Sequence, residues 1–435
     1  MKNDQHNKGK QVAVLGAGII GVNCALELQS LGFQVTLIDK VGVGEGCSKG
    51  NAGHFATEQV FPLAEVSLLW QLPKLLLDPL GPIALSPRYF PKALPWFLRF
   101  FANMFASKRA KNSAALKSLN RHAIVYYKPL LRAAQAEHLM VSKGSLLVFE
   151  SQKRRHALKI FNHYQKAGIA VKLLDRAQTL LLEPNLSEKV NYSLYFTDVA
   201  HTSDPHLICQ VLAKQSLKIG SNFLKAEVQN IHCQKQSVTL DLTQQSNNKQ
   251  ANTVMSKTFD HIVIATGAWS QTLVEKLGYQ LPIEAERGYS LDLAQSQCAH
   301  LTRPVASAER KFIMTPMAHG LRLAGTAEFA GLKQAANMKR ANMLYKNAVH
   351  LLATPPKFDE TAALPEQQWS GFRPSLPDSL PVIGRAPKHN NVLFALGHQH
   401  LGLTLGAITG KLIGQLITEQ PTDIDLKPFC ISRFN

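Results

Sequence analysis

The chain has 435 residues, of which 45% are hydrophobic and 18% charged, so it is expected to fold as a globular protein of more than one domain and not to be disordered. Six scattered cysteines without a C-x-x-C pair, a polar N-terminal stretch and no long apolar run argue against disulfides, secretion and a membrane-spanning helix. A cytoplasmic location is therefore expected. The net charge of +18 is uneven, because residues 81–160 hold fifteen Lys or Arg against two acidic residues, a net of +13.

The first predicted elements form a β-α-β unit. Val12–Leu15 is a short apolar run typical of a buried parallel strand. After a glycine turn, apolar residues fall on one helical face from Ile20 to Leu31, and Gly32 is expected to end that helix. Gln34–Asp39 is the next strand.

Glycines in this turn match G-x-G-x-x-G at Gly16, Gly18 and Gly21, and Asp39 follows Gly21 by eighteen residues. In such units the glycines allow a tight turn, close approach of a pyrophosphate and helix–strand packing, while the acid binds ribose hydroxyls. The spacing predicts a dinucleotide site and disfavours NADP, whose 2′-phosphate the acid would repel. It does not distinguish NAD from FAD, and a glycine turn that binds nothing is the alternative.

The middle of the chain is less regular. Seven prolines in residues 60–107 predict short helices separated by turns. Helical periodicity returns around Leu116–His138, and Ser145–Phe149 is a predicted strand. Ser203–Gly220 is predicted to be a helix with Ser203 at its N-cap. The polar segment Gln244–Thr253 is a predicted turn between two strands.

Two later segments repeat the strand–turn–helix pattern. His261–Ser270, "HIVIATGAWS", is a buried strand that runs into a glycine turn, and Asn391–Gly397 is a third such strand. The helix predicted at Leu401–Ile417 points its N-terminus at another glycine-rich turn. The nucleotide-binding domain is therefore expected to be assembled from separated pieces of chain.

Several of these stretches agree on one family. "VAVLGAGIIG", "SKGNAGH", "ATGAWS", "GFRPSLPDSLPVIG" and "GHQHLGLTLGAITG" resemble motifs of the FAD-dependent D-amino acid dehydrogenases of the D-amino acid oxidase superfamily, which has glycine and sarcosine oxidase as relatives. The resemblance covers nearly the whole chain. It implies an α/β fold with a glutathione-reductase-like, FAD-binding Rossmann domain and a smaller α+β substrate domain that has a mixed or antiparallel sheet.

The resemblance also implies domain bounds and cofactor residues. The FAD-binding domain is expected at residues 9–60, 196–280 and 366–435, and the substrate domain at residues 61–195 and 281–365. No cysteine follows "GFRP" closely, where sarcosine oxidase tethers its flavin, so FAD is expected to be noncovalent. The residues assigned to FAD are Gly16, Gly18, Ile19, Ile20, Gly21, Asp39, Lys40, Ser48, Asn51, Ala52, Gly53, Val228, Thr266, Gly267, Gly397, His398, Leu401, Gly402 and Thr404.

For the substrate, Arg373 matches the family's carboxylate clamp, and a guanidinium can grip a carboxylate with two parallel hydrogen bonds. An ordinary ion pair is the alternative reading of Arg373. Tyr289, in "ERGYSLDL", is a second candidate for the pocket. His398 and His400 are interpreted as contributing only their backbone groups and their shape to the motif. Neither a metal nor a general base is expected.

The implied reaction is oxidation of a D-amino acid, or of a cyclic D-imino acid such as hydroxy-D-proline, by hydride transfer from the α carbon to flavin N5. Gly46–Ala64 resembles hydroxyproline-catabolic dehydrogenases. An oxidase of glycine or sarcosine that uses O₂ is the nearest alternative. A flavin-dependent tRNA-modification protein is a further one, although no nucleic acid is expected because stacking aromatics and an RNA module are absent from the sequence. A binding protein with an inactive site is the remaining alternative.

A basic, aromatic-rich part of the chain suggests which electron acceptor the protein uses. Aromatic and leucine-rich residues 68–106 precede Lys108, Arg109 and Lys111, a pattern typical of segments that lie on an anionic membrane without crossing it. The pattern predicts peripheral binding to the inner face of the cytoplasmic membrane and a quinone or other non-oxygen acceptor. The alternative is that these residues cover the substrate domain or a dimer contact.

Overall fold

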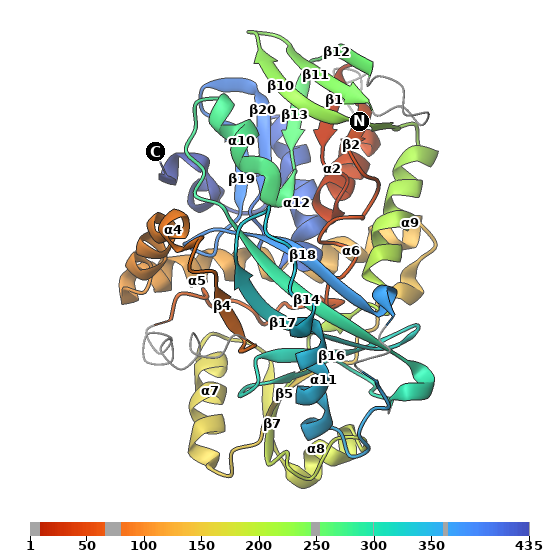
Figure 1. Ribbon diagram of the computed structural model, residues 1–435. Coiled ribbons are helices and arrows are strands. Elements are labelled where there is room, and N and C mark those ends of the chain that lie inside the picture. Colours follow the sequence, from red (N-terminus) through yellow and green to blue (C-terminus); the bar gives the residue numbers. More distant parts are fainter. Residues whose placement is uncertain (1–8, 66–79, 245–252, 299, 360–363, 435) are drawn as a thin grey trace.

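A computed structural model describes residues 9–65, 80–244, 253–298, 300–359 and 364–434. The chain is an α/β protein built on two large sheets, and one lies above the other in Figure 1. Segments distant in sequence contribute to both sheets, as expected for a discontinuous Rossmann architecture.

The first sheet is six-stranded and mostly parallel. Its core strand β1 (Gln11–Leu15) pairs in parallel with β2 and β13, and four of its residues, Val12 to Leu15, are fully buried, as expected for a parallel strand covered on both faces. The strand order is β19 (Val382–Ala386), β20 (His389–Leu396), β13 (His261–Ile264), β1, β2 (Gln34–Asp39) and β9 (Asn222–Lys225).

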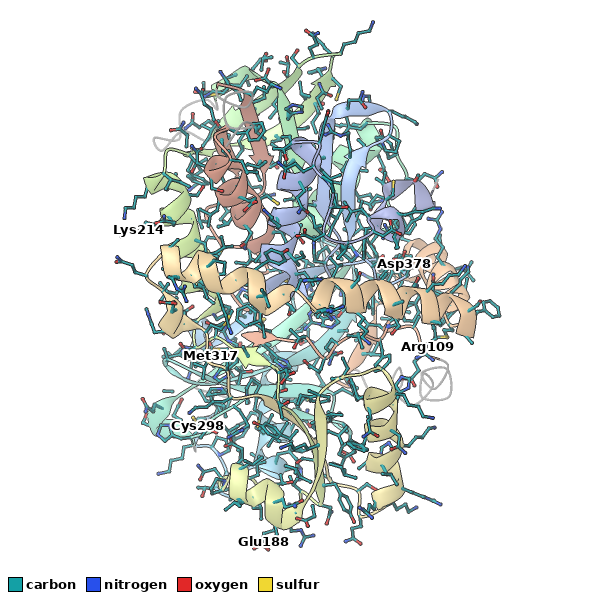
Figure 2. All side chains as sticks on the ribbon, turned by 180° about the vertical axis from the view of Figure 1, so that it is seen from behind. Arg109, Glu188, Lys214, Cys298, Met317 and Asp378 are labelled. Carbon is teal, nitrogen blue, oxygen red and sulfur yellow. The ribbon has the colours of Figure 1, made fainter. Side chains whose placement is uncertain are left out.

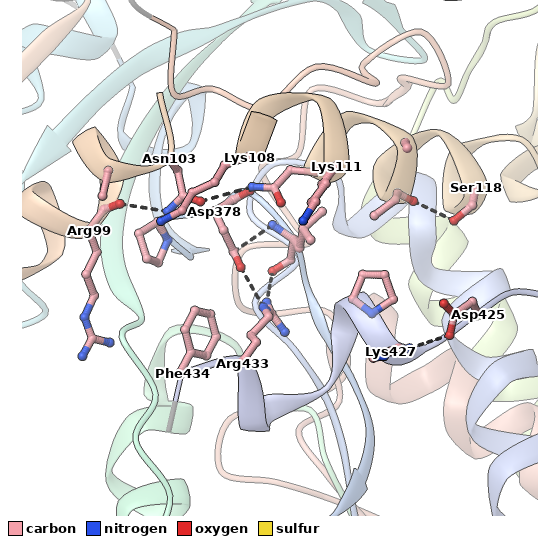
Figure 3. A pocket seen from close by; sticks show the side chains of 17 residues that line it. Arg99, Asn103, Lys108, Lys111, Ser118, Asp378, Asp425, Lys427, Arg433 and Phe434 are labelled. Atoms are coloured by element: carbon pink, nitrogen blue, oxygen red, sulfur yellow. Dashed lines mark hydrogen bonds and ion pairs between the residues drawn. The ribbon is translucent and has the colours of Figure 1, made fainter. Parts of the chain in front are cut away.

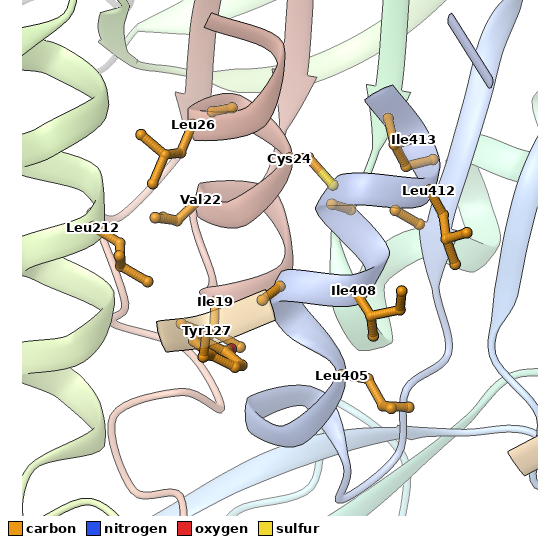
Figure 4. Close-up of a cluster of buried hydrophobic side chains, with 14 of the residues drawn as sticks. Ile19, Val22, Cys24, Leu26, Tyr127, Leu212, Leu405, Ile408, Leu412 and Ile413 are labelled. Atoms are coloured by element: carbon orange, nitrogen blue, oxygen red, sulfur yellow. The ribbon is translucent and has the colours of Figure 1, made fainter. Parts of the chain in front are cut away.

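Three helices cover one face of this sheet. Helix α2 (Ile19–Ser30) lies between α9 (Pro205–Lys218) and α12 (Gly402–Ile417), and their apolar side chains form one buried cluster (Figure 4). Cys24 lies in this cluster as a small buried residue, and burial raises the pKa of its thiol. The other face packs against α10 (Ser270–Lys276) and a three-stranded sheet of β10 (Glu227–Cys233), β11 (Val238–Gln244) and β12 (Thr253–Phe259).

The second sheet has nine strands and is mixed. Its order is β18 (Gln368–Ser375), β14 (Glu284–Ala294), β17 (Gly320–Phe329), β16 (Phe312–Met317), β15 (Val305–Ser307), β5 (Ser145–Phe149), β7 (Tyr192–Phe196) and β6 (Val171–Asp175), while β4 (Ile83–Leu85) pairs with β17. Its helices are α7 (Arg154–Lys166), α8 (Arg176–Leu182) and α11 (Lys339–Leu351). Two short strands, β3 (His54–Phe55) and β8 (Ala200–His201), form a separate antiparallel pair.

Helices between residues 90 and 133 form a layer of their own. They are α4 (Phe90–Ala102), α5 (Ala106–Asn120) and α6 (Ala123–Ala133). Figure 2 shows these helices crossing the back of the molecule at the level between the two sheets. Leu116, Leu119 and Tyr127 pack against the cluster of α2 and α12, so this layer contacts the six-stranded part.

The predicted β-α-β unit, the strand at Ser145–Phe149 and the helix near the C-terminus are confirmed. The helical pattern around Leu116–His138 belongs to two helices and a short 3₁₀ turn. The Ser203 cap is wrong: Asp204 is the N-cap, and its Oδ1 accepts from the Leu207 N–H at 2.9 Å. The predicted turn of residues 244–253 lies largely outside the described residues.

All six cysteines are free. The predicted domain bounds remain a prediction. One strand departs from them, because β18 lies within residues 366–435 yet pairs with β14 in the nine-stranded sheet. Local periodicity reveals a strand but not the sheet that it joins.

Candidate active site

The glycine turn between β1 and α2 uses its glycines in two ways. Gly16 has φ +98°, and a Cβ there would lie 2.5 Å from the Ala265 carbonyl oxygen; at Gly21 a Cβ would lie 1.8 Å from the Gly16 oxygen. These two glycines therefore permit close backbone packing. Gly18 differs, since the nearest atom to its Cβ would be Ser48 Oγ at 3.4 Å. Its open side faces a cavity at the N-terminus of α2.

Asp39 ends β2 and holds this turn together. Its Oδ2 accepts from the Ala17 N–H at 2.8 Å, and its Oδ1 accepts from the N–H groups of Val41 at 2.8 Å and Gly42 at 3.1 Å. The carboxylate also lines the cavity. That Asp39 binds ribose hydroxyls stays a prediction, and the structure adds that it accepts from three backbone donors.

The cavity beside Gly18 measures about 500 Å³ and lies at the carboxyl ends of the parallel strands, where open α/β sheets bind ligands. At one end, Lys40 pairs with Glu227 at 3.7 Å and lies 5.4 Å from the Trp269 ring centroid. The predicted cofactor residues that line this cavity are Gly16, Gly18, Ile19, Ile20, Asp39, Lys40, Ser48, Asn51, Val228, Thr266, Gly267, Gly397, His398 and Gly402.

The other five predicted cofactor residues lie nearby but off the wall of this cavity. Gly21 packs against the turn, and Ala52 lines a second cavity. Gly53 has φ +68° and would place a Cβ 2.7 Å from the Thr202 oxygen. Leu401 is the buried N-cap of α12, and Thr404 Oγ1 accepts from the Ala56 N–H at 2.9 Å. These contacts hold the cavity's supporting loops in place.

A second cavity, of about 560 Å³, adjoins the first, and Cys47, Asn51 and Gln399 line both. Arg373 and Tyr289 lie on its wall. Aromatic side chains make much of the remaining wall, namely Trp96, Phe97, Phe100, Phe101, Tyr164, Phe196, Phe312, Phe329 and Trp369. Polar and charged side chains complete the wall, among them Gln59, Lys311 and Gln399. A cavity that combines aromatic side chains with convergent polar groups is typical of a small-molecule site.

Arg373 is held by the strand opposite to it. Glu286 on β14 lies opposite Arg373 in the sheet register. Arg373 Nη1 donates to Glu286 Oε1 at 2.6 Å and to the Thr326 carbonyl oxygen at 3.1 Å. Ser375 Oγ donates to the second carboxylate oxygen of Glu286 at 2.8 Å. The Arg373 side chain is 21% exposed, and a guanidinium carries further N–H groups on Nη2 and Nε. Arg373 thus forms an ion pair with Glu286 and also lines the cavity.

Tyr289 lines the cavity, as the sequence suggested, but its hydroxyl is held by buried partners. Its hydroxyl donates to Glu328 Oε2 at 2.6 Å and accepts from the Asn337 N–H at 3.0 Å, and the residue is 1% exposed. Glu328 is in turn bound by Arg287 at 3.0 Å. Burial raises the pKa of the phenol. The hydroxyl therefore belongs to a buried hydrogen-bond network, although the residue itself lines the cavity.

Sequence reasoning missed His54 and Glu58 on the wall of the second cavity, and it assigned no side-chain role to His400, which also lines this cavity. Burial lowers the pKa of both imidazoles to about 4 and raises the pKa of Glu58 to about 7. The only sequence signal was the position of His54 directly after "NAG". His398 is hydrogen-bonded to Thr409 Oγ1 at 2.9 Å, and burial lowers its pKa to about 3.

These histidines do not form a metal centre. Across the described ranges, no group of three or more His, Cys, Asp or Glu side chains could hold a metal ion. With their low pKa values, the imidazoles are neutral near pH 7.

Comparison with known proteins gives the family of the chain. The family model described as FAD dependent oxidoreductase (DAO) matches residues 11–416. The chain is 32% identical to a D-amino-acid oxidase of Bradyrhizobium diazoefficiens over 98% of this chain and 99% of that protein. It is 29% identical to a D-amino acid dehydrogenase of Vibrio vulnificus over 96% and 99% of the two chains. Among solved structures, glycine oxidase from Geobacillus kaustophilus superposes with a TM-score of 0.71 at 21% identity, covering 98% and 99%.

Proposed function

Because the chain belongs to the DAO family of FAD-dependent oxidoreductases, we propose that it oxidises a D-amino acid at the α carbon and passes the electrons to a quinone or another non-oxygen acceptor. The observation that carries the proposal is Arg373, a partly paired guanidinium on the wall of an aromatic cavity that adjoins the cavity beside the Gly18 turn. Relatives named D-amino-acid oxidase and D-amino acid dehydrogenase support the choice of substrate.

The residues around the first cavity fit FAD. Gly18 leaves room beside the first N–H groups of α2, where the helix dipole favours a pyrophosphate. Val228 would meet the adenine end, and Gly397, His398 and Gly402 would line the flavin end. When bound there without a covalent link, FAD supplies a two-electron acceptor for the α-carbon hydride.

The chain's own residues then position the substrate. Arg373 would bind the α-carboxylate, fixing the α carbon toward the region that Cys47, Asn51 and Gln399 share between the cavities. Substrate packed against the aromatic wall would exclude water from this region. The substrate's amino group loses a proton to solvent before the hydride leaves, so that its nitrogen lone pair forms the C=N bond of the imine. Since the nearby His54 and His400 are neutral, they place no positive charge beside this amino group. The released imine is hydrolysed in solution to a 2-oxo acid, or remains cyclic when the substrate is an imino acid.

The experiment is a steady-state panel of D- and L-amino acids and D- and L-imino acids, including hydroxy-D-proline, with either O₂ or a quinone analogue as the acceptor. We expect 2-oxo acid formation from D-amino acids and little peroxide. The cyclic imino acid is the second candidate substrate, because Asn51, Ala52 and His54, from the segment that resembles hydroxyproline dehydrogenases, line the substrate cavity. Rapid peroxide formation would instead identify an oxidase that uses O₂, and activity with L-enantiomers alone would overturn the proposal.

Asp39 provides a first prediction about the cofactor. Asp39→Ala should keep the fold but weaken FAD binding about 5- to 150-fold, because three backbone donors at the turn lose their acceptor at a cost of about 1–3 kcal/mol. FAD affinity is measured by titrating apoprotein and following flavin fluorescence. Asp260→Ala is the matched control, since that carboxylate accepts from Gln11 N–H at the opposite end of β1. Unchanged affinity in Asp39→Ala would refute this role.

We also propose that helix α4 docks on an anionic membrane. One face of α4 is buried at Ala93, Trp96 and Phe100, and the last two line the substrate cavity. This face therefore covers the substrate site, which was the alternative to membrane binding in the sequence analysis. The other face is exposed, with Leu98 60% exposed and Phe90 and Leu94 beside it on the helical surface. Residues 66–79, which carry the rest of the leucine-rich stretch, lie outside the described residues.

A basic groove of about 830 Å³ runs beside this helix (Figure 3). Its charged lining consists of Arg99, Lys108, Lys111, Lys427 and Arg433 against Asp378 and Asp425, and Asp378 is already paired with Arg433 at 2.7 Å. Each basic residue near an anionic surface contributes about 1 kcal/mol. Within the described ranges, no helix is long and apolar enough to cross a bilayer.

Liposome sedimentation tests this docking. The protein should bind vesicles that contain anionic lipid and should be released by salt, since exposed charges are screened within about 8 Å at physiological ionic strength. Leu98→Asp should weaken binding about 10-fold or more, because it places a charge on the exposed apolar face. Val254→Asp, on the exposed face of β12, is the matched control. Protein that stays in the supernatant at low salt with anionic vesicles would contradict membrane docking.

A further inference from the structure

Glu58 is a buried carboxyl group on the wall of the substrate cavity. The residue is 3% exposed, and its Oε2 has no hydrogen-bond partner among the described residues. It follows β3 by three residues, in the segment that also carries Asn51 and Ala52 past both cavities. A buried polar oxygen without a partner is rare in folded proteins and indicates a ligand or a functional role.

The neighbours of Glu58 do not neutralise it. His54 Nε2 lies 3.6 Å from Glu58 Oε1, and Gln59 Nε2 lies 3.5 Å from the same oxygen. Since burial lowers the pKa of His54 to about 4, this imidazole is neutral near pH 7 and supplies no positive charge. Burial raises the pKa of Glu58 to about 7, although hydrogen bonds from its own backbone and from Gln59 lower it, which reflects the cost of holding a carboxylate without a cationic partner in this wall.

Glu58 also lies away from the Arg373 end of the cavity. Arg373 is on β18, at one edge of the nine-stranded sheet. Glu58 lies 3.6 Å from His54, and Phe61, three residues after Glu58, packs on Tyr164 of α7 with ring centroids 5.2 Å apart. Because Tyr164 packs on Phe196 of β7, near the other edge of that sheet, Arg373 and Glu58 lie toward opposite ends of the cavity. Apolar rings make much of the wall beside them.

We propose that Glu58 binds the cationic end of the substrate's side chain, so that the preferred substrates are linear D-amino acids with a terminal ammonium or guanidinium group. The proposal rests on the proposed function, since it requires the α-carboxylate to be held by Arg373. A side chain that enters this cavity can lay its methylene groups against the aromatic wall and place its charge beside Glu58 Oε2. The ion pair then compensates the desolvation of both charges.

Two other carboxylates line the cavity and must be distinguished from Glu58. Glu286 is already paired with Arg373 at 2.6 Å. Glu309 is exposed, and its Oε1 accepts from the Ser151 N–H at 3.2 Å. An exposed, solvated carboxylate gains little from pairing with a cation. Glu58 is therefore the residue that should discriminate between charged and neutral side chains.

The test compares D-lysine with D-norleucine, which differ by the terminal amino group, in the FAD-loaded protein. Wild-type protein should oxidise D-lysine with a kcat/KM about 10-fold or more above that for D-norleucine. Glu58→Gln should lower kcat/KM for D-lysine about 30- to 100-fold and that for D-norleucine far less, so that the preference is lost. Glu65→Gln, an exposed carboxylate seven residues further along, is the matched control and should keep the preference.

The outcomes separate this proposal from the proposed function. Oxidation of D-norleucine equal to or better than that of D-lysine by the wild type would overturn the cation site and leave D-amino acid oxidation standing. If Glu309→Gln loses the preference for D-lysine and Glu58→Gln keeps it, Glu309 binds the cationic group, and the proposal is overturned. Activity with neither compound, nor with any other D-amino acid, would overturn the proposed function itself. The wild-type comparison decides the matter even where Glu58→Gln fails to fold.

Discussion

Gly18→Val is expected to yield a folded protein that purifies without FAD. The Cβ itself meets only Ser48 Oγ, at 3.4 Å, so the turn can tolerate a side chain in the absence of cofactor. The valine methyl groups, however, project into the cavity beside the first turn of α2, where the pyrophosphate must approach the backbone. Flavin absorbance per protein should fall at least about 10-fold, the equivalent of about 1.4 kcal/mol.

The control for this variant is a glycine with a different task. Gly16→Ala places a Cβ 2.5 Å from the Ala265 oxygen at φ +98°, so it should reduce the yield of folded protein as well as its flavin content. Circular dichroism and thermal unfolding, compared with those of wild-type apoprotein, separate the two effects. A yellow, fully loaded Gly18→Val protein would show that the pyrophosphate does not contact this turn.

Arg373→Ala is expected to leave a yellow protein with severely impaired catalysis. Loss of a charge-assisted, two-point contact with the substrate carboxylate costs roughly 2–5 kcal/mol, so kcat/KM should fall about 30- to 5,000-fold with a raised KM. Arg373→Lys should recover only part of this loss, because an ammonium group lacks the planar fork of a guanidinium.

The ion pair of Arg373 requires its own control. Removing the guanidinium leaves Glu286 without its partner at 2.6 Å, which also lowers the stability of the protein. Glu286→Gln removes the ion pair but retains the guanidinium, so it should reduce kcat/KM less than Arg373→Ala does. Arg373→Ala with near-normal kcat/KM for its best substrate would place the carboxylate contact elsewhere.

Local patterns allowed the nucleotide-binding unit to be predicted. The elements β1, α2 and β2 and the glycine spacing between them follow from short-range sequence, and fourteen predicted cofactor residues line one cavity. The hydrogen bonds of Asp39 could not be predicted from its spacing, because its acceptor role toward Ala17 appears only when β2 lies beside the turn.

Long-range contacts limited the prediction of the substrate site. The Tyr289 hydroxyl is bound by Glu328, 39 residues later in the chain, on the neighbouring strand β17. Glu58 and His54 were missed because the residues that share their cavity come from α7, β5 and α4, which are separate parts of the sequence. A motif search cannot show that a carboxyl group is buried without a partner.

Anaerobic reduction of the bound flavin shows directly whether a D-amino acid is the electron donor. Pairs of D- and L-enantiomers of lysine, norleucine, alanine and proline are added to the purified yellow protein without any acceptor, and the visible flavin absorbance is followed. We expect the D-enantiomers to bleach the flavin fully within the time of turnover, D-lysine fastest, while the L-enantiomers leave it oxidised. A flavin that stays oxidised with every D-amino acid, or that is bleached only by L-enantiomers, would contradict D-amino acid oxidation.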